Sequence, residues 1–174
     1  IAEFKRESPS RGVIRDDLNV GEYVRSCADG GASAFSILTE PTRFGGSLDD
    51  LRAAARNTEV PLLMKDFVVS SRQVEYAAAL GASAVLLIAR CLSRLALREL
   101  AHACSRLRLT PLIECHDADE IAAAVREEHA AIGINNRDLA TLRIDRERGE
   151  SLLASVPADR VVVAESGYGD PAAI

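Results

Sequence analysis

The sequence predicts an α/β fold of the TIM (β/α)8-barrel type, present as about seven βα units. Apolar runs alternate with helix-like segments and little sequence lies between them, which is typical of βαβ units around a parallel sheet. The sequence Gly-Ala-Ser-Ala occurs twice, at 31–34 and 81–84, each time before an apolar run, and this favours a repeated unit. Several runs end on a charged or amide residue, as expected if the carboxyl ends of the strands build one shared pocket.

Seven apolar runs are expected to form the strands. Most are continuously apolar, which is typical of parallel strands covered on both faces. No Gly-x-Gly-x-x-Gly motif follows the first run, so a barrel is favoured over a dinucleotide-binding fold. The runs lie at residues 1–5, 33–38, 61–65, 84–88, 110–115, 131–135 and 161–165.

Six helices are expected between the strands. Ser70-Ser71 and Asp117 each precede a helical pattern and are good N-cap residues. Gly31 and Gly81 suit the position just after a helix, where the backbone often turns left-handed. The helical patterns cover residues 19–29, 47–57, 71–80, 93–107, 117–128 and 145–155.

Length and composition limit the function. The 174 residues are expected to form a single, partial barrel domain (1–174) without the eighth unit, because a complete barrel needs at least ~200 residues. A net charge of −5, 4% aromatic residues and no Trp argue against a nucleic-acid or membrane partner. With no run of roughly 20 apolar residues and no signal-peptide pattern, we expect a cytoplasmic protein. The cysteines and histidines lack metal-binding spacings, so no metal site is expected.

The first run places Glu3 and Lys5 on one side of a strand, because alternate residues face the same way. In a barrel that side is the interior, and Ala2 and Phe4 then face the helices. A purely structural ion pair explains Glu3 and Lys5 equally well. The following loop, 6–12, is rigid and polar, and its hydroxyls and amides, with Lys5, suit a phosphate or carboxylate.

Lys65 and Glu114 each end a buried run and are expected to face inward. A partly desolvated ammonium is a tunable acid, and an inward carboxylate near it would complete a general acid–base pair. A Lys65–Asp66 pair is the alternative, although neighbouring side chains on a strand point in opposite directions. Asn135 ends another run, and its amide would orient a hydroxyl or carbonyl. Arg137 either serves this pocket or anchors its loop.

The last run ends in Glu165-Ser166-Gly167. Gly167 would let a ligand approach the backbone, and the loop after the seventh strand of a barrel often forms half of a phosphate site. Arg43, in a Gly-rich loop after the second run, either closes over a ligand or is solvated. His116 is expected to be structural or bound in a loop.

Together these motifs resemble the indole-3-glycerol phosphate synthase family, (β/α)8 enzymes of tryptophan biosynthesis. The resemblance follows the family's order and covers nearly the whole chain. It rests on IAEFKRESPSRG (1–12), SILTEPTRFGGSLDDL (36–51), PLLMKDFVV (61–69), GASAVLLIA (81–89), PLIECHD (111–117), GINNRDLATLRID (133–145) and VVVAESG (161–167).

The resemblance implies an anionic substrate, 1-(2-carboxyphenylamino)-1-deoxyribulose 5-phosphate. Ring closure with loss of carbon dioxide and water would give indole-3-glycerol phosphate, a carboxy-lyase reaction that uses no cofactor and no metal. By the same resemblance, Lys65 is the general acid of ring closure and Glu114 the acid or base of the dehydration. Lys5 and Ser8 would hold the anionic ends of the substrate, and Glu3 would orient the lysines.

The resemblance also assigns roles near the last two strands. Asn135 would position the reacting hydroxyl, with Glu165 and Ser166 alongside, and Gly167 would donate a backbone amide to phosphate. The family has an N-terminal helical extension and an eighth unit, both of which this chain is expected to lack. We therefore expect an exposed apolar seam between the first and last strands and poor activity of the isolated chain.

Two other functions are left open. A barrel aldolase would use Lys65 as a Schiff-base nucleophile. A non-catalytic phospho-ligand-binding barrel would need only the anion-binding residues. The sequence does not decide the oligomeric state or a fusion to other tryptophan-pathway domains.

Overall fold

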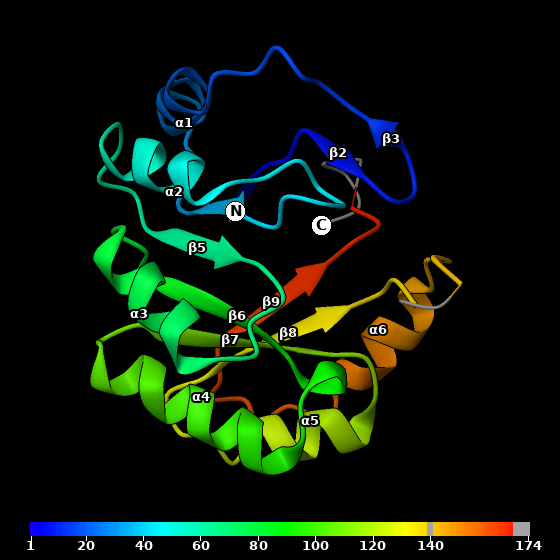
Figure 1. Cartoon of the computed structure of the whole chain (residues 1–174). Helices are drawn as coiled ribbons and strands as arrows, with labels where there is room; N and C mark the ends of the chain where they lie inside the picture. The colour runs from blue at the N-terminus through cyan, green and yellow to red at the C-terminus, as the bar shows by residue number, and fades with distance from the viewer. Residues whose placement is uncertain (139–140, 169–174) are drawn as a thin grey trace.

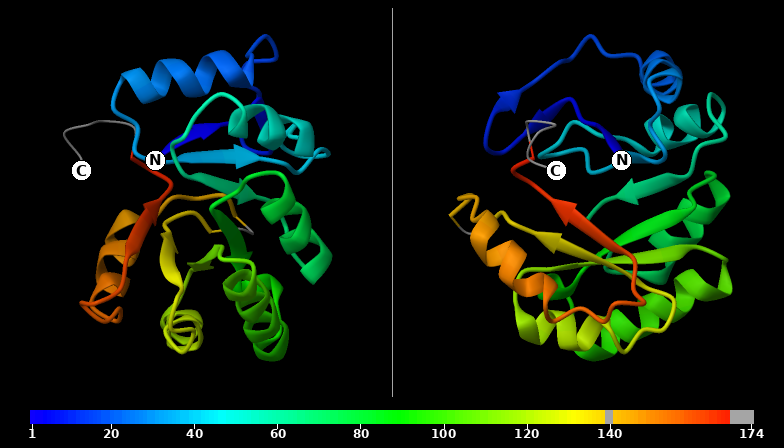
Figure 2. Two further views of the ribbon diagram at one scale, coloured as in Figure 1. Left: turned by 90° about the vertical axis from the view of Figure 1, so that its left-hand side faces the viewer. Right: turned by 180° about the vertical axis from the view of Figure 1, so that it is seen from behind.

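The computed structural model describes residues 1–138 and 141–168, which form one curled, parallel sheet with alternating helices. The result is a half-barrel (Figures 1 and 2), consistent with the predicted TIM-barrel-like fold. Each strand pairs with the next main strand along the chain, in the order β1-β4-β5-β6-β7-β8-β9. The strands are β1 (Ala2–Phe4), β4 (Phe35–Leu38), β5 (Leu62–Lys65), β6 (Ala84–Ile88), β7 (Thr110–Cys115), β8 (Ala131–Asn135) and β9 (Val162–Glu165).

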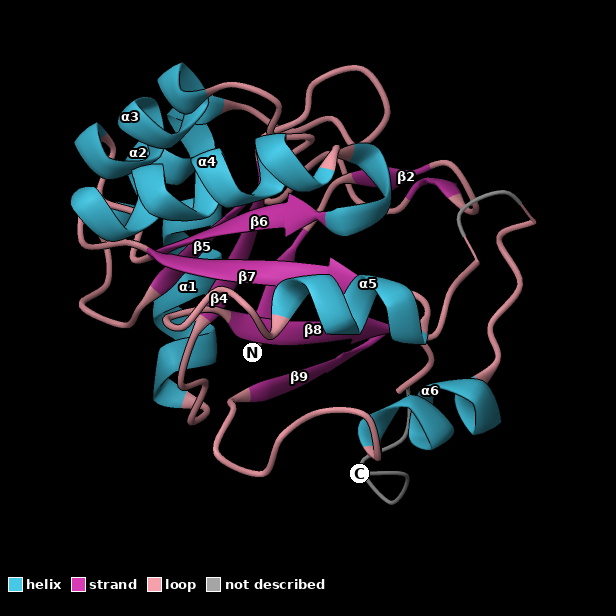
Figure 3. Ribbon diagram, turned by 90° about the horizontal axis from the view of Figure 1, so that it is seen from below, coloured by secondary structure: helices cyan, strands magenta, loops and turns pink. Residues whose placement is uncertain are grey.

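The helices lie around the outside of the sheet (Figure 3). Ser70 and Asp117 are N-caps as predicted, and Gly31 and Gly81 follow their helices with positive φ angles of 92° and 90°. No helix in the described part of the chain is long and apolar enough to cross a membrane. The helices are α1 (Val20–Asp29), α2 (Leu48–Ala55), α3 (Ser71–Ala79), α4 (Arg94–Arg106), α5 (Ala118–Ala124) and α6 (Arg146–Leu153).

Helix α5 is shorter than the predicted 117–128. The guanidinium of Arg160, before β9, donates to the carbonyls of Val125 (2.8 Å), Glu127 (2.8 Å) and Glu128 (2.7 Å). These carbonyls are satisfied by a distant residue, so the chain can leave the helix without unpaired acceptors. The helical sequence pattern gave no sign of this long-range contact.

The segment predicted as a polar loop at 6–12 contains a small antiparallel hairpin. Strand β2 (Glu7–Ser8) pairs with β3 (Gly12–Val13), and Gly12 has a positive φ of 63°. Arg6 ties the hairpin to α2 through two hydrogen bonds to Asp50, of 2.6 and 2.8 Å. Strands of two residues are too short for an apolar pattern to reveal them. A short 3-10 helix, η1 (Ala89–Cys91), follows β6.

The two faces of the sheet have different cores. The outer face packs beneath the helices and includes Phe4, which is 1% exposed, so its predicted orientation toward the helices is confirmed. The inner face carries a small apolar cluster and, beyond it, the charged ends of the strands. This inner cluster consists of Leu63, Leu86, Ile88 and Leu112. The residues just before the two edge strands are exposed: Ile1, before β1, is 64% exposed and Val161, before β9, is 68% exposed.

Candidate active site

The Lys65 ammonium, at the carboxyl end of β5, lies between two carboxylates. Its Nζ is 3.0 Å from Glu3 Oε2 on β1 and 3.0 Å from Glu165 Oε2 on β9. Lys65 is not paired with Asp66, which accepts a hydrogen bond from Thr39 Oγ1 (2.6 Å). The curl of the sheet thus brings together the ends of three strands that are distant in sequence.

Glu3 is held by two lysines and a serine. Lys5 Nζ lies 2.5 Å from Glu3 Oε1, and Ser36 Oγ on β4 donates to Oε2 at 3.3 Å. Burial raises the pKa of Glu3, but the charges of Lys65 and Lys5 and their hydrogen bonds outweigh burial and bring it to about 2. The Tyr23 hydroxyl donates to the Glu3 carbonyl (2.9 Å) and fixes the backbone. At neutral pH Glu3 is therefore an anion in contact with both lysines.

Lys65 is held in its protonated form. Burial alone lowers the pKa of an ammonium, but Glu165, Glu3 and Glu114 together raise the pKa of Lys65 above its ordinary value. At neutral pH the group is thus an ammonium that can donate a proton or a hydrogen bond. It is not the free amine that nucleophilic attack on a carbonyl requires.

Glu114, on β7, has the opposite behaviour. Its side chain is 3% exposed, and burial, followed by repulsion from Glu165, raises its pKa to about 7 against the effects of Lys65, His116 and Asn135. A carboxyl group that titrates near neutral pH can both give and accept a proton under working conditions. The arrangement thus sets a protonated ammonium near a carboxyl group that titrates around neutral pH, and such a pair can support acid–base chemistry.

Asn135 and Arg137 differ in their relation to the cluster. The Asn135 side chain hydrogen-bonds to Glu114, and its Oδ1 accepts the Arg137 backbone N–H at 2.9 Å. The Arg137 guanidinium donates to the Leu142 carbonyl (2.9 Å). Of the two predicted roles of Arg137, the structure shows the loop-anchoring contact, and its role toward substrate stays a prediction.

Ser8, Ser166 and Gly167 lie outside the ion-pair network but at the same end of the sheet, beyond the carboxyl ends of the strands. Ser8 is buried in the β2–β3 hairpin, which Figures 1 and 2 place beyond the carboxyl ends of the strands. Ser166 and Gly167 follow β9 with positive φ angles of 62° and 88°. A Cβ on Gly167 would lie 2.8 Å from Ile144 Cγ2, so this turn requires glycine.

Gly133, on β8, makes room for Glu165 and was not predicted as a site residue. A Cβ at this position would lie 2.5 Å from Glu165 Oε1. That oxygen is buried, and no hydrogen-bond partner is found for it among the described residues. A glycine inside a strand often marks a close approach, so the sequence did hold this signal. The polar Ser36 inside the buried run Phe35–Leu38 is a second such signal.

His116 was predicted to be structural or loop-bound, and it lies directly behind Glu114. Its side chain is fully buried, with Nε2 3.4 Å from Glu114 Oε1 and Nδ1 3.3 Å from Glu120 Oε2. In the described residues no group of three or more His, Cys, Asp or Glu side chains is arranged to hold a metal ion.

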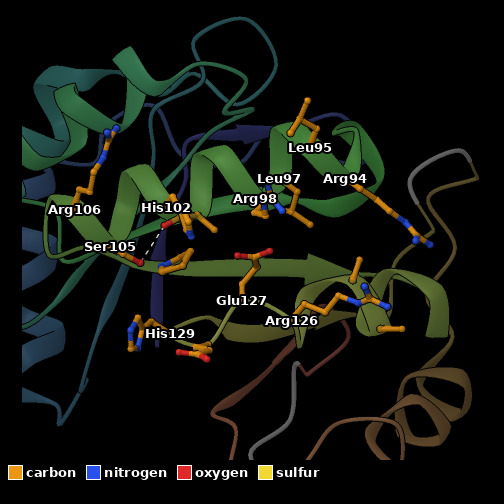
Figure 4. Close-up of a pocket in the computed structure, with 15 residues that line it drawn as sticks. Arg94, Leu95, Leu97, Arg98, His102, Ser105, Arg106, Arg126, Glu127 and His129 are labelled. Atoms are coloured by element: carbon orange, nitrogen blue, oxygen red, sulfur yellow. Dashed lines mark hydrogen bonds between the residues drawn. The ribbon is translucent and has the colours of Figure 1, made fainter.

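A separate groove lies on the outer surface between α4 and α5 (Figure 4). Its volume is about 960 Å³. It is distinct from the charged site around Lys65, because its walls come from the two helices and the loop after α5. The residues that line it include the buried Leu97, Ala101 and Pro111. Four arginines line it, namely Arg94, Arg98, Arg106 and Arg126.

Comparison with known proteins places this chain in a family. The family model described as indole-3-glycerol phosphate synthase matches residues 1–174. Proteins with that name from a Nocardioides species and from Rhodopirellula baltica are 48% identical over 171 residues and 44% identical over 167 residues. These matches cover 98% and 96% of this chain but 66% and 64% of the relatives. The chain thus spans somewhat less than two thirds of their length.

Solved structures support the fold at low sequence identity. The N-acetylmannosamine-6-phosphate 2-epimerase of Clostridium perfringens has a TM-score of 0.67 at 13% identity, covering 90% of this chain and 75% of its own. Thiamine phosphate pyrophosphorylase of Pyrococcus furiosus has a TM-score of 0.60 at 19% identity, covering 87% and 70%. At these identities the likeness concerns the fold alone.

Proposed function

Because the chain belongs to the indole-3-glycerol phosphate synthase family, we propose that the protein containing it catalyses the reaction of that name in tryptophan biosynthesis. The substrate is 1-(2-carboxyphenylamino)-1-deoxyribulose 5-phosphate. A carbon of its aromatic ring attacks the ketone, the carboxylate leaves as carbon dioxide, and the new hydroxyl leaves as water. The product is indole-3-glycerol phosphate.

The observation that carries this proposal is the Lys65 ammonium between Glu3 and Glu165, near a carboxyl group that titrates around pH 7. Attack on a ketone develops negative charge on its oxygen, and a positioned ammonium stabilises that charge and supplies the proton. The later dehydration needs a group that exchanges protons at neutral pH, which suits Glu114. Asn135, hydrogen-bonded to Glu114, would orient the hydroxyl that leaves.

The anionic ends of the substrate would be bound around this centre. Lys5, beside Glu3, is 29% exposed in its side chain and can offer a hydrogen bond to an anionic group. We assign the phosphate to the hairpin residue Ser8 and to the turn after β9, where Ser166 and Gly167 have positive φ angles. Arg137 would join them only after leaving its contact with the Leu142 carbonyl.

The aldolase alternative is weakened by the charge state of Lys65. A Schiff base forms from a neutral amine, which active sites generate by desolvation or by a neighbouring cation. Here three carboxylates raise the pKa of Lys65, which disfavours the neutral amine. The surroundings of Lys65 therefore suit proton donation.

We further propose that residues 1–174 belong to a single (β/α)8-barrel domain of a cytoplasmic enzyme. The parallel order of the seven main strands and the continuous curl of the sheet support the barrel. The four cysteines are free, as expected in a reducing compartment. An eighth βα unit and an N-terminal extension in the complete protein would then finish the phosphate site, as in the family.

The deciding experiment uses the complete protein, the synthetic substrate and the fluorescence of the indole product. We expect turnover, and we expect borohydride added during turnover to leave Lys65 unmodified. A covalent adduct on Lys65 would support the aldolase instead. A folded, complete protein that binds the substrate without turnover would support the phospho-ligand-binding barrel.

A further inference from the structure

A buried chain of side chains ends on Glu114. His116 Nε2 lies 3.4 Å from Glu114 Oε1, and His116 Nδ1 lies 3.3 Å from Glu120 Oε2. Glu120 also accepts the His116 backbone N–H (2.6 Å) and a hydrogen bond from Arg90 Nε (2.9 Å). The imidazole is thus fixed from behind and faces the carboxyl group that the proposed function uses.

Glu120 determines which ring nitrogen carries a hydrogen. Burial raises the pKa of Glu120, but hydrogen bonds from His116 and Arg90 outweigh burial and lower it to about 2. Near neutral pH Glu120 is therefore a carboxylate that can only accept hydrogen bonds. The ring nitrogen that faces it, Nδ1, must then be the protonated one.

The contact between Nε2 and Glu114 needs a proton. Nε2 is buried and, in the described part of the chain, has no hydrogen-bond partner. If the ring were neutral and Glu114 ionised, two acceptors would face each other in a buried site, which is costly. One proton placed between them, on either group, removes this conflict, and an approach of a few tenths of an ångström completes a hydrogen bond.

We infer that His116 is a positioning residue that shares one proton with Glu114 and, with Glu120, sets the protonation state in which Glu114 enters the reaction. The catalytic part of this inference rests on the proposed function. The shared proton itself is a property of the folded protein and can be tested without substrate.

The proton balance fits the dehydration step. As the carbon–oxygen bond breaks, the leaving hydroxyl takes a proton from Glu114 and departs as water. A proton released from the substrate when the double bond forms returns to Glu114. Between these events the ionised Glu114 faces the unprotonated Nε2 of His116, and this unfavourable contact between two acceptors favours the return of the proton. The pair ends the turnover with the number of protons it had at the start.

The electrostatic surroundings predict the direction of the effect. Glu165 raises the pKa of Glu114, whereas Lys65, His116 and Asn135 lower it. Removal of the imidazole should therefore raise the pKa of Glu114 further. The charged, titratable and amide groups that face the pair or its partners come from several elements: Lys65 of β5, Arg90 and Cys91 of η1, Asn135 of β8, Asp117 and Glu120 of the α5 N-terminus, and Glu165 of β9.

The first test is NMR of the complete protein with 13C-carboxyl-labelled glutamate, with the Glu114 signal assigned by Glu114→Gln. We expect His116→Gln to move the Glu114 titration to higher pH by about one unit, a ~10-fold change in proton affinity. Glu120→Gln should move it in the same direction by less. His129→Gln, the same change at an exposed histidine, is the matched control and should leave it unmoved.

The second test is the pH dependence of kcat in the same variants. The limb assigned to Glu114 should move with the NMR titration in His116→Gln, while KM changes less than kcat. If the Glu114 titration does not move in folded His116→Gln, the shared proton is rejected and His116 has only a packing role. If His116→Gln does not fold, Glu120→Gln decides, and an unmoved titration there overturns the inference. Shifted titrations without turnover in any variant would keep the shared proton and reject the proposed function.

Discussion

Two regions of the molecule gather cations, and they differ in burial and pairing. At the inner ends of β1, β5 and β9, the Lys65 ammonium is 3.0 Å from each of two carboxylates. In the outer groove between α4 and α5, the arginines are exposed, and none has an ion-pair partner among the described residues (Figure 4). These are Arg94, Arg98, Arg106 and Arg126.

The difference lies in how the cations are held, which their number alone does not reveal. An exposed guanidinium keeps its water, and salt at physiological strength screens it beyond about 8 Å. A buried ammonium has lost most of its water, so it persists only when it is paired or used. Pairing also fixes its position, which proton transfer requires.

The largest effect should follow removal of the inner cation. We expect Lys65→Ala to lower kcat by ~10²–10⁴-fold, the usual range for a general acid. It should also destabilise the fold, because Glu3 and Glu165 would lose their shared partner. Single-turnover kinetics and chemical denaturation would measure the two losses. Full activity in Lys65→Ala would exclude the ammonium from the mechanism. The buried ion pairs at the strand ends would then have no more catalytic role than the arginines of the outer groove.

Glu114→Gln should lower kcat by at least ~100-fold while the fold is retained. The amide keeps the size of the carboxyl group and can still hydrogen-bond to Asn135, but it cannot exchange a proton. The pH profile of the parent should lose its limb near pH 7 in this variant. A limb that persists there would belong to another group.

The charged groups at the carboxyl ends of the strands should also give the stability an unusual pH dependence. The pKa of Glu3 is lowered from 4.5 to about 2, so its contribution is present above pH 4.5 and is lost as the pH falls toward 2. The pKa of Glu114 is raised from 4.5 to about 7, so its contribution is present below pH 4.5 and is lost as the pH rises through 7. Each pKa change, of about 2.5, corresponds to about 3 kcal/mol.

Urea denaturation at a series of pH values would separate the two carboxyl groups. Glu114→Gln should remove the loss of stability between pH 4.5 and 7 and leave the acid limb. Glu3→Gln should weaken the acid limb and leave the loss toward pH 7. The same experiment on Arg98→Ala, in the outer groove, should reproduce the parent curve. Equal slopes in all three variants would mean that the inner carboxyl groups titrate as exposed ones do.

Gly133→Ala should lower kcat by about 10-fold and cause little loss of stability. The added methyl group would overlap Glu165 Oε1, at 2.5 Å, and the flexible carboxylate can yield more easily than the strand. Lys65 would then lose one of its two anchors and its orientation. Combining Gly133→Ala with Glu165→Asp, a shorter carboxylate, should recover part of the activity. No change in kcat would show that the position of Glu165 is unimportant.

Much of this comparison could be predicted from the sequence, because strand parity is a local property. Apolar runs gave the seven main strands, and alternation placed Glu3 and Lys5 inward. The family resemblance implied that Glu3 orients the lysines, but the residue pattern alone could not give the partners of Lys65. Glu3 and Glu165 are 62 and 100 residues away and meet Lys65 only through the curl of the sheet. The position of His116 behind Glu114 likewise depends on the turn into α5.

The smallest effect is expected from substitutions in the outer groove. They test whether its exposed arginines are independent of the chemistry. Arg98→Ala and Arg126→Ala remove exposed guanidinium groups that make no ion pair with the described residues. We expect each to change the free energy of unfolding by less than about 0.5 kcal/mol, the usual limit for such surface positions, and to leave kcat unchanged. Because screening should already have weakened these charges, raising the salt concentration should not alter the result. A clear loss of kcat in either variant would mean that exposed charges on the outer surface affect catalysis. Burial would then no longer distinguish the two regions functionally.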